Sequence, residues 1–316
     1  MKFCLSIEIQ EGMTYADTLA MTMAGEEAGF QAALLAEHYY PSSGIMGRMS
    51  ADAWVFLGGL ARDTGRIRLG SLVSPVTFRH PSVLAKMAAT LDHMTGGRAE
   101  LGIGAGWLES EHAAYGFPFA APAERVDLME EQLQVITGLW TQDPFSFDGT
   151  HYRLQDCHFA PLPVQRPHPP ILIGGRPTSV RLVRLAAEYG QEFVIALATP
   201  AQCREVRDRL DRACEKVGRD PSTLGLAVFA GVCVADTDQE VGRRRDLLLA
   251  GARPHMRNTD AWIMGTPGPA AEQVRQFEAA GVGRLMFSVE NDLHREMIPV
   301  LGQVLPLVRC SCSLSG

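Results

Sequence analysis

The chain has 316 residues, of which 46% are hydrophobic and 21% charged, and its formal net charge is −7. This composition is that of an ordinary globular enzyme, far from the disordered and membrane classes, and the negative charge argues against a nucleic-acid partner. The seven scattered cysteines form no Cys-x-x-Cys pair and indicate reduced thiols, so we expect a cytoplasmic protein. We expect no leader sequence and no membrane span, because the sequence lacks the apolar stretches that both require.

Strand and helix signals alternate along the chain, which is typical of repeated βα units. Strands are expected at 2–9, at 32–36, from 67, from 98, and at 170–173, 193–197, 224–235 and 284–288. Helices are expected at 15–28, from 52, from 81, at 123–140, 178–189 and 201–217, beside Pro254 and Pro269, and from 294. Eight such units predict one α/β domain, a (β/α)₈ TIM barrel over 1–310, with a proline-rich insertion at about 143–170 and a loose tail at 311–316.

Residues that pack poorly but suit a binding site follow two of these strands. Ser74 and Pro75 end the first, and Gly102, Gly104 and Gly106 lead to Trp107 after the second. A dinucleotide fingerprint would need glycine where tryptophan stands, so that interpretation fails. Two alternatives remain: a bare backbone that a flat ligand approaches closely, with the tryptophan as a wall, or a tight turn between strand and helix.

Glu37 and His38 come directly after an apolar strand, which places them at the C-terminal mouth of a barrel. Histidine there can act as acid, base or hydrogen-bond donor near neutral pH. The alternative is a histidine whose hydrogen bonds are satisfied by the next loop.

A second candidate lies between a strand and a helix, where Gly174 and Gly175 precede Arg176, Thr178 and Ser179. Free backbone N–H groups, two hydroxyls and an arginine predict a phosphate site. The alternative is a capped helix start with an unrelated arginine.

The sequence lacks the residues that several other classes of enzyme require. None of the three lysines falls at a predicted strand end, so a Schiff-base nucleophile is missing, and no His-x-His or Gly-x-Ser-x-Gly motif occurs. We therefore expect no metal site. Glu109, Glu111 and His112 cluster in the sequence, and we expect a solvated helix start there.

Several segments together resemble the bacterial luciferase-like family, and within it the branch of oxidoreductases that depend on coenzyme F420, a phosphorylated 5-deazaflavin. The similar segments are SPVTFRHP (74–81), AKMAATLD (85–92), GGR (96–98), LGIGAGW (101–107) and RPHPPILIGG (166–175). The resemblance implies a (β/α)₈ barrel that binds coenzyme F420 or FMN at its C-terminal mouth.

The resemblance also implies roles for individual residues. His38, beside Glu37, falls near the reactive ring, and a non-prolyl cis peptide is expected at Leu72–Val73. Further cofactor contacts are implied for Leu72, Val73, Ser74, Gly104, Ala105, Gly106, Trp107, Tyr115, Gly174, Gly175, Arg176, Thr178 and Ser179. The chain departs from its relatives at 191–194 and at Leu108, where some relatives have asparagine.

The implied activity is hydride transfer between coenzyme F420 and a small organic substrate, with His38 exchanging the accompanying proton. The alternatives are a reduced-FMN monooxygenase that uses dioxygen, and a flavin-binding protein without turnover. A homodimer and a separate reductase that supplies reduced cofactor are the expected partners. The loop at 39–49 and the insertion are expected to vary with the substrate.

Overall fold

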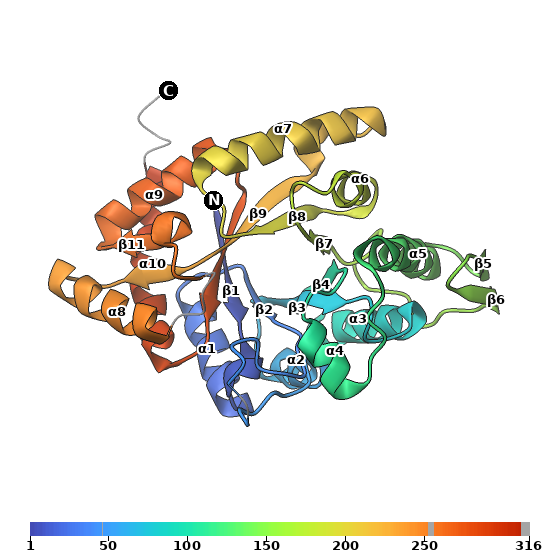
Figure 1. Ribbon diagram of the computed structural model, residues 1–316, viewed down its shortest axis with the longest axis horizontal. Coiled ribbons are helices and arrows are strands. Elements are labelled where there is room, and N and C mark those ends of the chain that lie inside the picture. Colours follow the sequence, from blue (N-terminus) through green and yellow to red (C-terminus); the bar gives the residue numbers. More distant parts are fainter. Residues whose placement is uncertain (46, 252–255, 311–316) are drawn as a thin grey trace.

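The structure is a computed structural model that describes residues 1–45, 47–251 and 256–310. Eight parallel strands close into a barrel in the order β1-β12-β9-β8-β7-β4-β3-β2 (Figure 1). They are β1 (Lys2–Ile7), β2 (Ala32–Leu35), β3 (Arg68–Pro75), β4 (Ala99–Gly104), β7 (Ile171–Gly174), β8 (Glu192–Ala196), β9 (Gly225–Ala230) and β12 (Arg284–Val289). The predicted (β/α)₈ barrel is confirmed, and its strands are the eight expected from the sequence.

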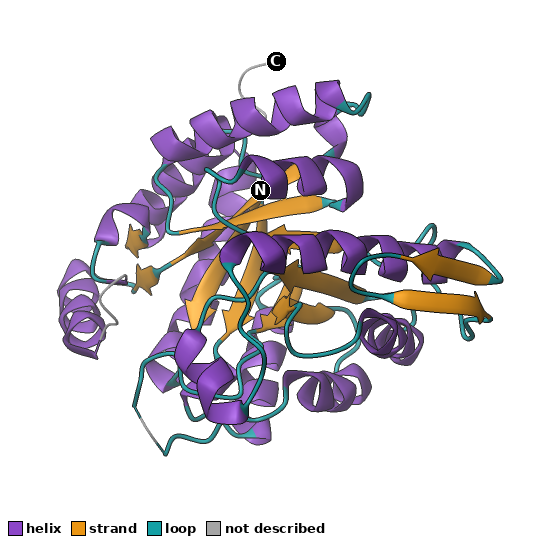
Figure 2. Cartoon of the chain, turned by 45° about the vertical axis from the view of Figure 1, so that its right-hand side comes forward, coloured by secondary structure: helices purple, strands orange, loops and turns teal. Residues whose placement is uncertain are grey.

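Helices cover the outside of the strands (Figure 2). They are α1 (Tyr15–Glu27), α2 (Ala53–Asp63), α3 (Pro81–Thr95), α4 (Glu109–Tyr115), α5 (Pro122–Thr141), α6 (Val180–Tyr189), α7 (Pro200–Lys216), α8 (Asp238–Gly251), α9 (Pro267–Ala279) and α10 (Asp292–Cys310). Helix α3 begins at Pro81 and ends before Gly96, whose φ of 64° suits a residue without a side chain. No helix within the described part of the chain is both long and apolar enough to cross a membrane.

The barrel interior changes from charged to apolar along its axis. At the N-terminal end Arg284 lies 2.7 Å from Glu100 and 3.2 Å from Glu192, and Arg68 lies 2.5 Å from Glu100. Above this layer an apolar cluster fills the interior, formed by Cys4, Ala32, Leu34, Leu172, Val194, Ala227 and Met286. Buried charges need such partners, and the filled interior leaves the C-terminal mouth as the place for a ligand.

Two segments depart from the simple alternation. The strand expected at 224–235 is interrupted at Gly231, where a β-carbon would lie 2.4 Å from the Trp262 ring, and β10 (Val232–Val234) pairs instead with β11 (Ile263–Gly265). Within 143–170, β5 (Phe145–Asp148) and β6 (Arg153–Cys157) form an antiparallel hairpin that projects beyond α5 in Figure 1. Pro254 and the tail at 311–316 lie outside the described residues.

Candidate active site

The predicted site residues lie at the ends of four strands that are neighbours in the barrel, in the order β7-β4-β3-β2. His38 follows β2, residues 72–74 lie in β3, Gly104 ends β4, and Gly174 ends β7. Because parallel strands end on one face of a barrel, the structure brings these segments together at its C-terminal mouth.

Strand β3 is irregular where the sequence predicted a segment behind a cofactor ring. The Leu72–Val73 peptide bond is cis, and the register of β3 against β4 shifts between Ser71 and Ser74. The cis bond predicted at this position is therefore confirmed. We refer to residues 72–74 as the β3 bulge.

The glycines of the neighbouring strands make room for this bulge. A β-carbon on Gly104 would lie 2.6 Å from Val73 Cγ2, and one on Gly174 would lie 3.0 Å from Val73 Cγ1. On Gly102 it would lie 2.2 Å from the carbonyl oxygen of Ser71. At Gly102 and Gly104 the chain itself makes the close approach, because β4 continues to Gly104.

The turn comes immediately after β4. Gly106 has a φ of 79°, and a β-carbon there would lie 3.2 Å from Thr77 Oγ1. Ala105 is half-buried, whereas Trp107 is 59% exposed. The Trp107 ring meets the His38 ring edge to face, with centroids 5.7 Å apart, so the predicted wall stands beside the predicted proton carrier.

His38 is held by a buried carboxylate that the sequence analysis assigned to a solvated helix start. Glu111 Oε2 lies 3.0 Å from His38 Nδ1, and Glu111 Oε1 accepts the Tyr39 backbone N–H at 2.5 Å. The Glu111 side chain is 1% exposed and that of His38 is 13% exposed. Because a carboxylate only accepts, Nδ1 carries the hydrogen in this pair, and Nε2 is left to accept a proton.

The expectation of a solvated start for the helix at 109 is wrong for two of its residues. Glu109 is exposed, but Glu111 and His112 are each 1% exposed, and His112 Nε2 lies 2.6 Å from Thr77 Oγ1. Glu111 has partners in the segment after β2, and His112 has a partner in the β3–α3 loop. Tyr115, in the last turn of α4, is 54% exposed. Among the residues that the structure describes, no group of three or more His, Cys, Asp or Glu could hold a metal ion.

Glu37 points away from the mouth. It is 2% exposed, pairs with Arg79, and accepts hydrogen bonds from Trp54 Nε1 at 3.1 Å and from Ser74 Oγ. Adjacent residues of an extended segment face opposite sides. The structure therefore separates the predicted pair, with His38 facing the mouth and Glu37 the layer between barrel and helices.

The segment that joins β7 to α6 holds the predicted phosphate residues. Ser179 caps α6, and its Oγ accepts the Leu182 N–H at 3.4 Å, as the capped-helix alternative predicts. Arg176 and Thr178 are exposed, and a β-carbon on Gly175 would lie 2.5 Å from Leu182 Cδ1. A capped helix start still carries unpaired N–H groups and a positive dipole end, so the phosphate alternative also stands.

Two polar residues after β1 were not predicted. Glu8, 6% exposed, accepts from Ser6 Oγ at 3.2 Å and from Gln10 Nε2 at 2.9 Å. The amide oxygen of Gln10 is buried and has no hydrogen-bond partner among the residues that the structure describes. Ser6 lies two residues after Cys4, whose side chain faces the barrel interior, so Ser6 faces the same side. Ser6, Glu8 and Gln10 therefore add hydrogen-bond acceptors to the inner side of the mouth.

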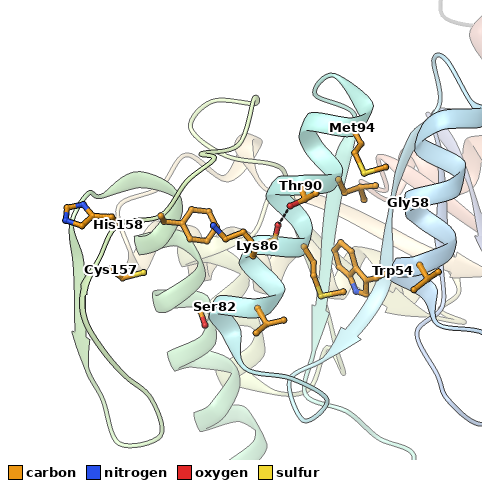
Figure 3. Close-up of a pocket in the computed structure, with 13 residues that line it drawn as sticks. Trp54, Gly58, Ser82, Lys86, Thr90, Met94, Cys157 and His158 are labelled. Carbon is orange, nitrogen blue, oxygen red and sulfur yellow. Dashed lines mark hydrogen bonds between the residues drawn. The ribbon is translucent and has the colours of Figure 1, made fainter.

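A groove lies elsewhere on the molecule. An apolar groove of about 550 Å³ runs along the outer face of α2 and α3 and reaches the end of β6 (Figure 3). Trp54, Met94 and Lys86 line it, whereas none of the predicted site residues does. This groove is therefore separate from the mouth, where His38, Glu111 and the β3 bulge form the candidate site.

Two relatives match the chain over most of its length. An FMNH2-dependent dimethylsulfone monooxygenase of Pseudomonas putida is 27% identical, over 92% of this chain and 86% of the relative. An F420-dependent glucose-6-phosphate dehydrogenase of Beutenbergia cavernae is 29% identical, over 86% of each chain.

Solved structures share the fold at lower identity. An F420-dependent secondary alcohol dehydrogenase in complex with an F420-acetone adduct superposes with a TM-score of 0.83, at 20% identity, over 98% of this chain and 99% of the other. A long-chain alkane monooxygenase has a TM-score of 0.83 at 16% identity, over 98% and 91%. The model of the family described as luciferase-like monooxygenase matches residues 1–298. The resemblance seen in the sequence is thereby confirmed, and the chain belongs to the luciferase-like monooxygenase family.

Proposed function

We propose that this protein is an oxidoreductase that transfers a hydride between coenzyme F420 and a small organic substrate. The observation that carries the proposal is the His38–Glu111 pair at the mouth, 3.0 Å apart. His38 directly follows Glu37, which accepts a hydrogen bond from Ser74 of the β3 bulge. Hydride transfer to or from a carbon that is bonded to oxygen or nitrogen also moves a proton at that oxygen or nitrogen, and an oriented imidazole can carry this proton near neutral pH.

The residues at the mouth fit a ring with a phosphorylated tail. The β3 bulge would lie behind the ring, Gly104, Ala105, Gly106 and Trp107 would flank it, and Tyr115 would lie at the edge of the pocket. The phosphate would meet Arg176, Thr178, Ser179 and the N–H groups at the start of α6. When bound, such a cofactor supplies the redox chemistry through its ring.

In this proposal His38 transfers the proton, and Glu111 orients His38. Glu111 fixes the imidazole through Nδ1, so that Nε2 faces the substrate and takes or gives the proton there. The Trp107 ring restricts the imidazole from the side, 5.7 Å away between centroids. Glu37 serves as a positioning residue, because its carboxylate is turned toward Trp54 and Ser74.

Reduced-FMN monooxygenation is the second candidate, supported by the Pseudomonas putida relative at 27% identity. That relative depends on FMNH2, so a separate reductase would have to supply reduced cofactor to the present protein. A third candidate is flavin binding without turnover, which the ordered His38–Glu111 pair disfavours. We further propose that the protein acts as a homodimer.

Titration of the purified protein with coenzyme F420 and, separately, with FMN, followed by fluorescence, tests the proposal. We expect coenzyme F420 to bind at least about tenfold more tightly than FMN, a difference of about 1.4 kcal/mol. Tight binding of FMN alone would replace the first candidate by the second, and binding of neither would remove both.

Substitution of the imidazole tests the proton role. His38→Ala is expected to lower kcat by about 10²- to 10⁴-fold, the usual contribution of general acid–base catalysis, with little change in cofactor affinity. His158→Ala is the matched control, because His158 directly follows the hairpin and its side chain is 74% exposed. Equal turnover by the two variants would remove His38 from the mechanism.

A further inference from the structure

Three residues connect the β3 bulge with the N-terminal end of the loop at 39–49. Arg79 pairs with Glu37 on one side, and its Nη2 donates to Tyr39 Oη at 2.9 Å on the other. The Glu37 side chain is 1% exposed and that of Arg79 is 11% exposed. We call Glu37, Arg79 and Tyr39 the brace.

One end of the brace reaches the bulge. Ser74 Oγ donates to the Glu37 carboxylate and lies 3.0 Å from Ser71 Oγ, which donates to the Gly102 carbonyl at 3.0 Å. This hydrogen-bond chain spans the register shift between β3 and β4. The position of Ser74, the last residue of the bulge, is therefore tied to the Glu37 carboxylate.

The other end reaches the histidine. The Tyr39 backbone N–H donates to Glu111, the residue that holds His38. Arg79 itself is fixed at its backbone, because Gln132 Nε2 donates to the carbonyls of Val76 at 2.7 Å and Arg79 at 3.4 Å. A guanidinium anchored in this way can hold two partners at once through its fork of donors.

We propose that Arg79 is a positioning residue that couples the β3 bulge to the His38–Glu111 pair. Through the brace, the surface behind the cofactor ring and the imidazole above it keep a fixed separation. The part of this inference that concerns the cofactor rests on the proposed function. The coupling itself does not, because every contact in it belongs to the protein.

Hydrogen exchange of the unliganded protein, followed by mass spectrometry of its peptides, tests the coupling. Tyr39→Phe removes the hydroxyl that Arg79 contacts and leaves no buried charge unpaired. Arg79→Lys keeps a charge opposite Glu37 but loses the second arm of the fork. We expect both variants to speed exchange in peptides that cover 71–76 as well as in those that cover 37–40.

The matched control is Tyr15→Phe, which removes a tyrosine hydroxyl bonded to Asp63 at 2.7 Å on the outer helices. It should change exchange in neither segment. Faster exchange confined to 37–40 in the Tyr39 and Arg79 variants would overturn the coupling, and so would equal effects of the control.

Cofactor titration separates this inference from the proposed function. If the wild type binds coenzyme F420 or FMN, Arg79→Lys should weaken that binding by about tenfold, and Tyr15→Phe should leave it unchanged. Unchanged affinity in Arg79→Lys would remove the brace from cofactor binding. If the wild type binds neither cofactor, the proposed function fails, and the exchange experiment still decides whether the brace couples its two ends.

Discussion

Replacement of Glu111 by glutamine should disable His38 through its tautomer. The Glu111 carboxylate accepts from His38 Nδ1 at 3.0 Å and from the Tyr39 N–H at 2.5 Å. A glutamine has one oxygen and one NH2 group, and the backbone N–H of Tyr39 can only donate. The amide oxygen must therefore face Tyr39, and the NH2 group then faces Nδ1, which has to give up its hydrogen. The proton moves to Nε2, the nitrogen that should accept.

Two contributions determine how far kcat falls in Glu111→Gln. A hydrogen bond to a charged group is worth about 1.5–3 kcal/mol, which is a factor of about 10 to 150 in rate if it acts in the transition state. The reversed tautomer also removes the base function, which contributes about 10²- to 10⁴-fold. We expect kcat to fall at least about 100-fold in Glu111→Gln, with cofactor affinity changed by less than about threefold.

Steady-state kinetics and cofactor titration of the same preparations provide the assay. Glu109→Gln is the control, because Glu109 lies two positions earlier on α4 and is exposed. The reasoning is refuted if Glu111→Gln loses no more activity than Glu109→Gln. It is also refuted if the loss in Glu111→Gln resides entirely in cofactor affinity.

Two further predictions concern stability. Gly102→Ala places a β-carbon 2.2 Å from the Ser71 carbonyl oxygen, so the free energy of unfolding should fall by about 1–3 kcal/mol. Gly242→Ala places a β-carbon with no atom of the described part of the chain within 4 Å, so it should be neutral or stabilising, and urea unfolding of both variants checks the difference. Burial raises the pKa of Glu192 to about 7, against the opposing charge of Arg284. Near neutral pH the folded state therefore binds more protons than the unfolded state, so the free energy of unfolding should fall as pH rises from about 5 to about 8. It should fall less in Glu192→Gln, and an equal pH dependence of unfolding in both proteins would contradict this.

The barrel was predictable because its signals are local. Each strand is a short apolar run, and residues that favour the start or end of a helix mark the helices between strands, as Pro81 and Gly96 do for α3. Eight repeats of this pattern are compatible with few folds. Where a contact from a distant segment intervenes, the prediction failed. The strand expected at 224–235 is divided at Gly231, where the Trp262 ring occupies the space of a side chain, and β10 pairs with the distant β11.

The site was predictable in its segments and only partly in its residues. The loops after β2, β3, β4 and β7 were identified because unusual residues follow apolar strands. Glu111 was missed because its partners, His38 and Tyr39, lie 73 and 72 positions away, and its neighbours Glu109 and His112 suggest an ordinary solvated helix. Burial of one side of so short a helix as α4 leaves no periodic signal over seven residues.

Strand alternation explains why Glu37 and His38 do not act as a pair. Ala32 and Leu34 of β2 face the barrel interior, so the same alternation sends His38 inward and Glu37 outward. Outside the barrel wall a carboxylate requires a charged partner, and Arg79 from the β3–α3 loop supplies it. The adjacent residues Glu37 and His38 thus have different roles. The inward residue meets the ligand, and the outward one holds the wall against which that ligand would rest.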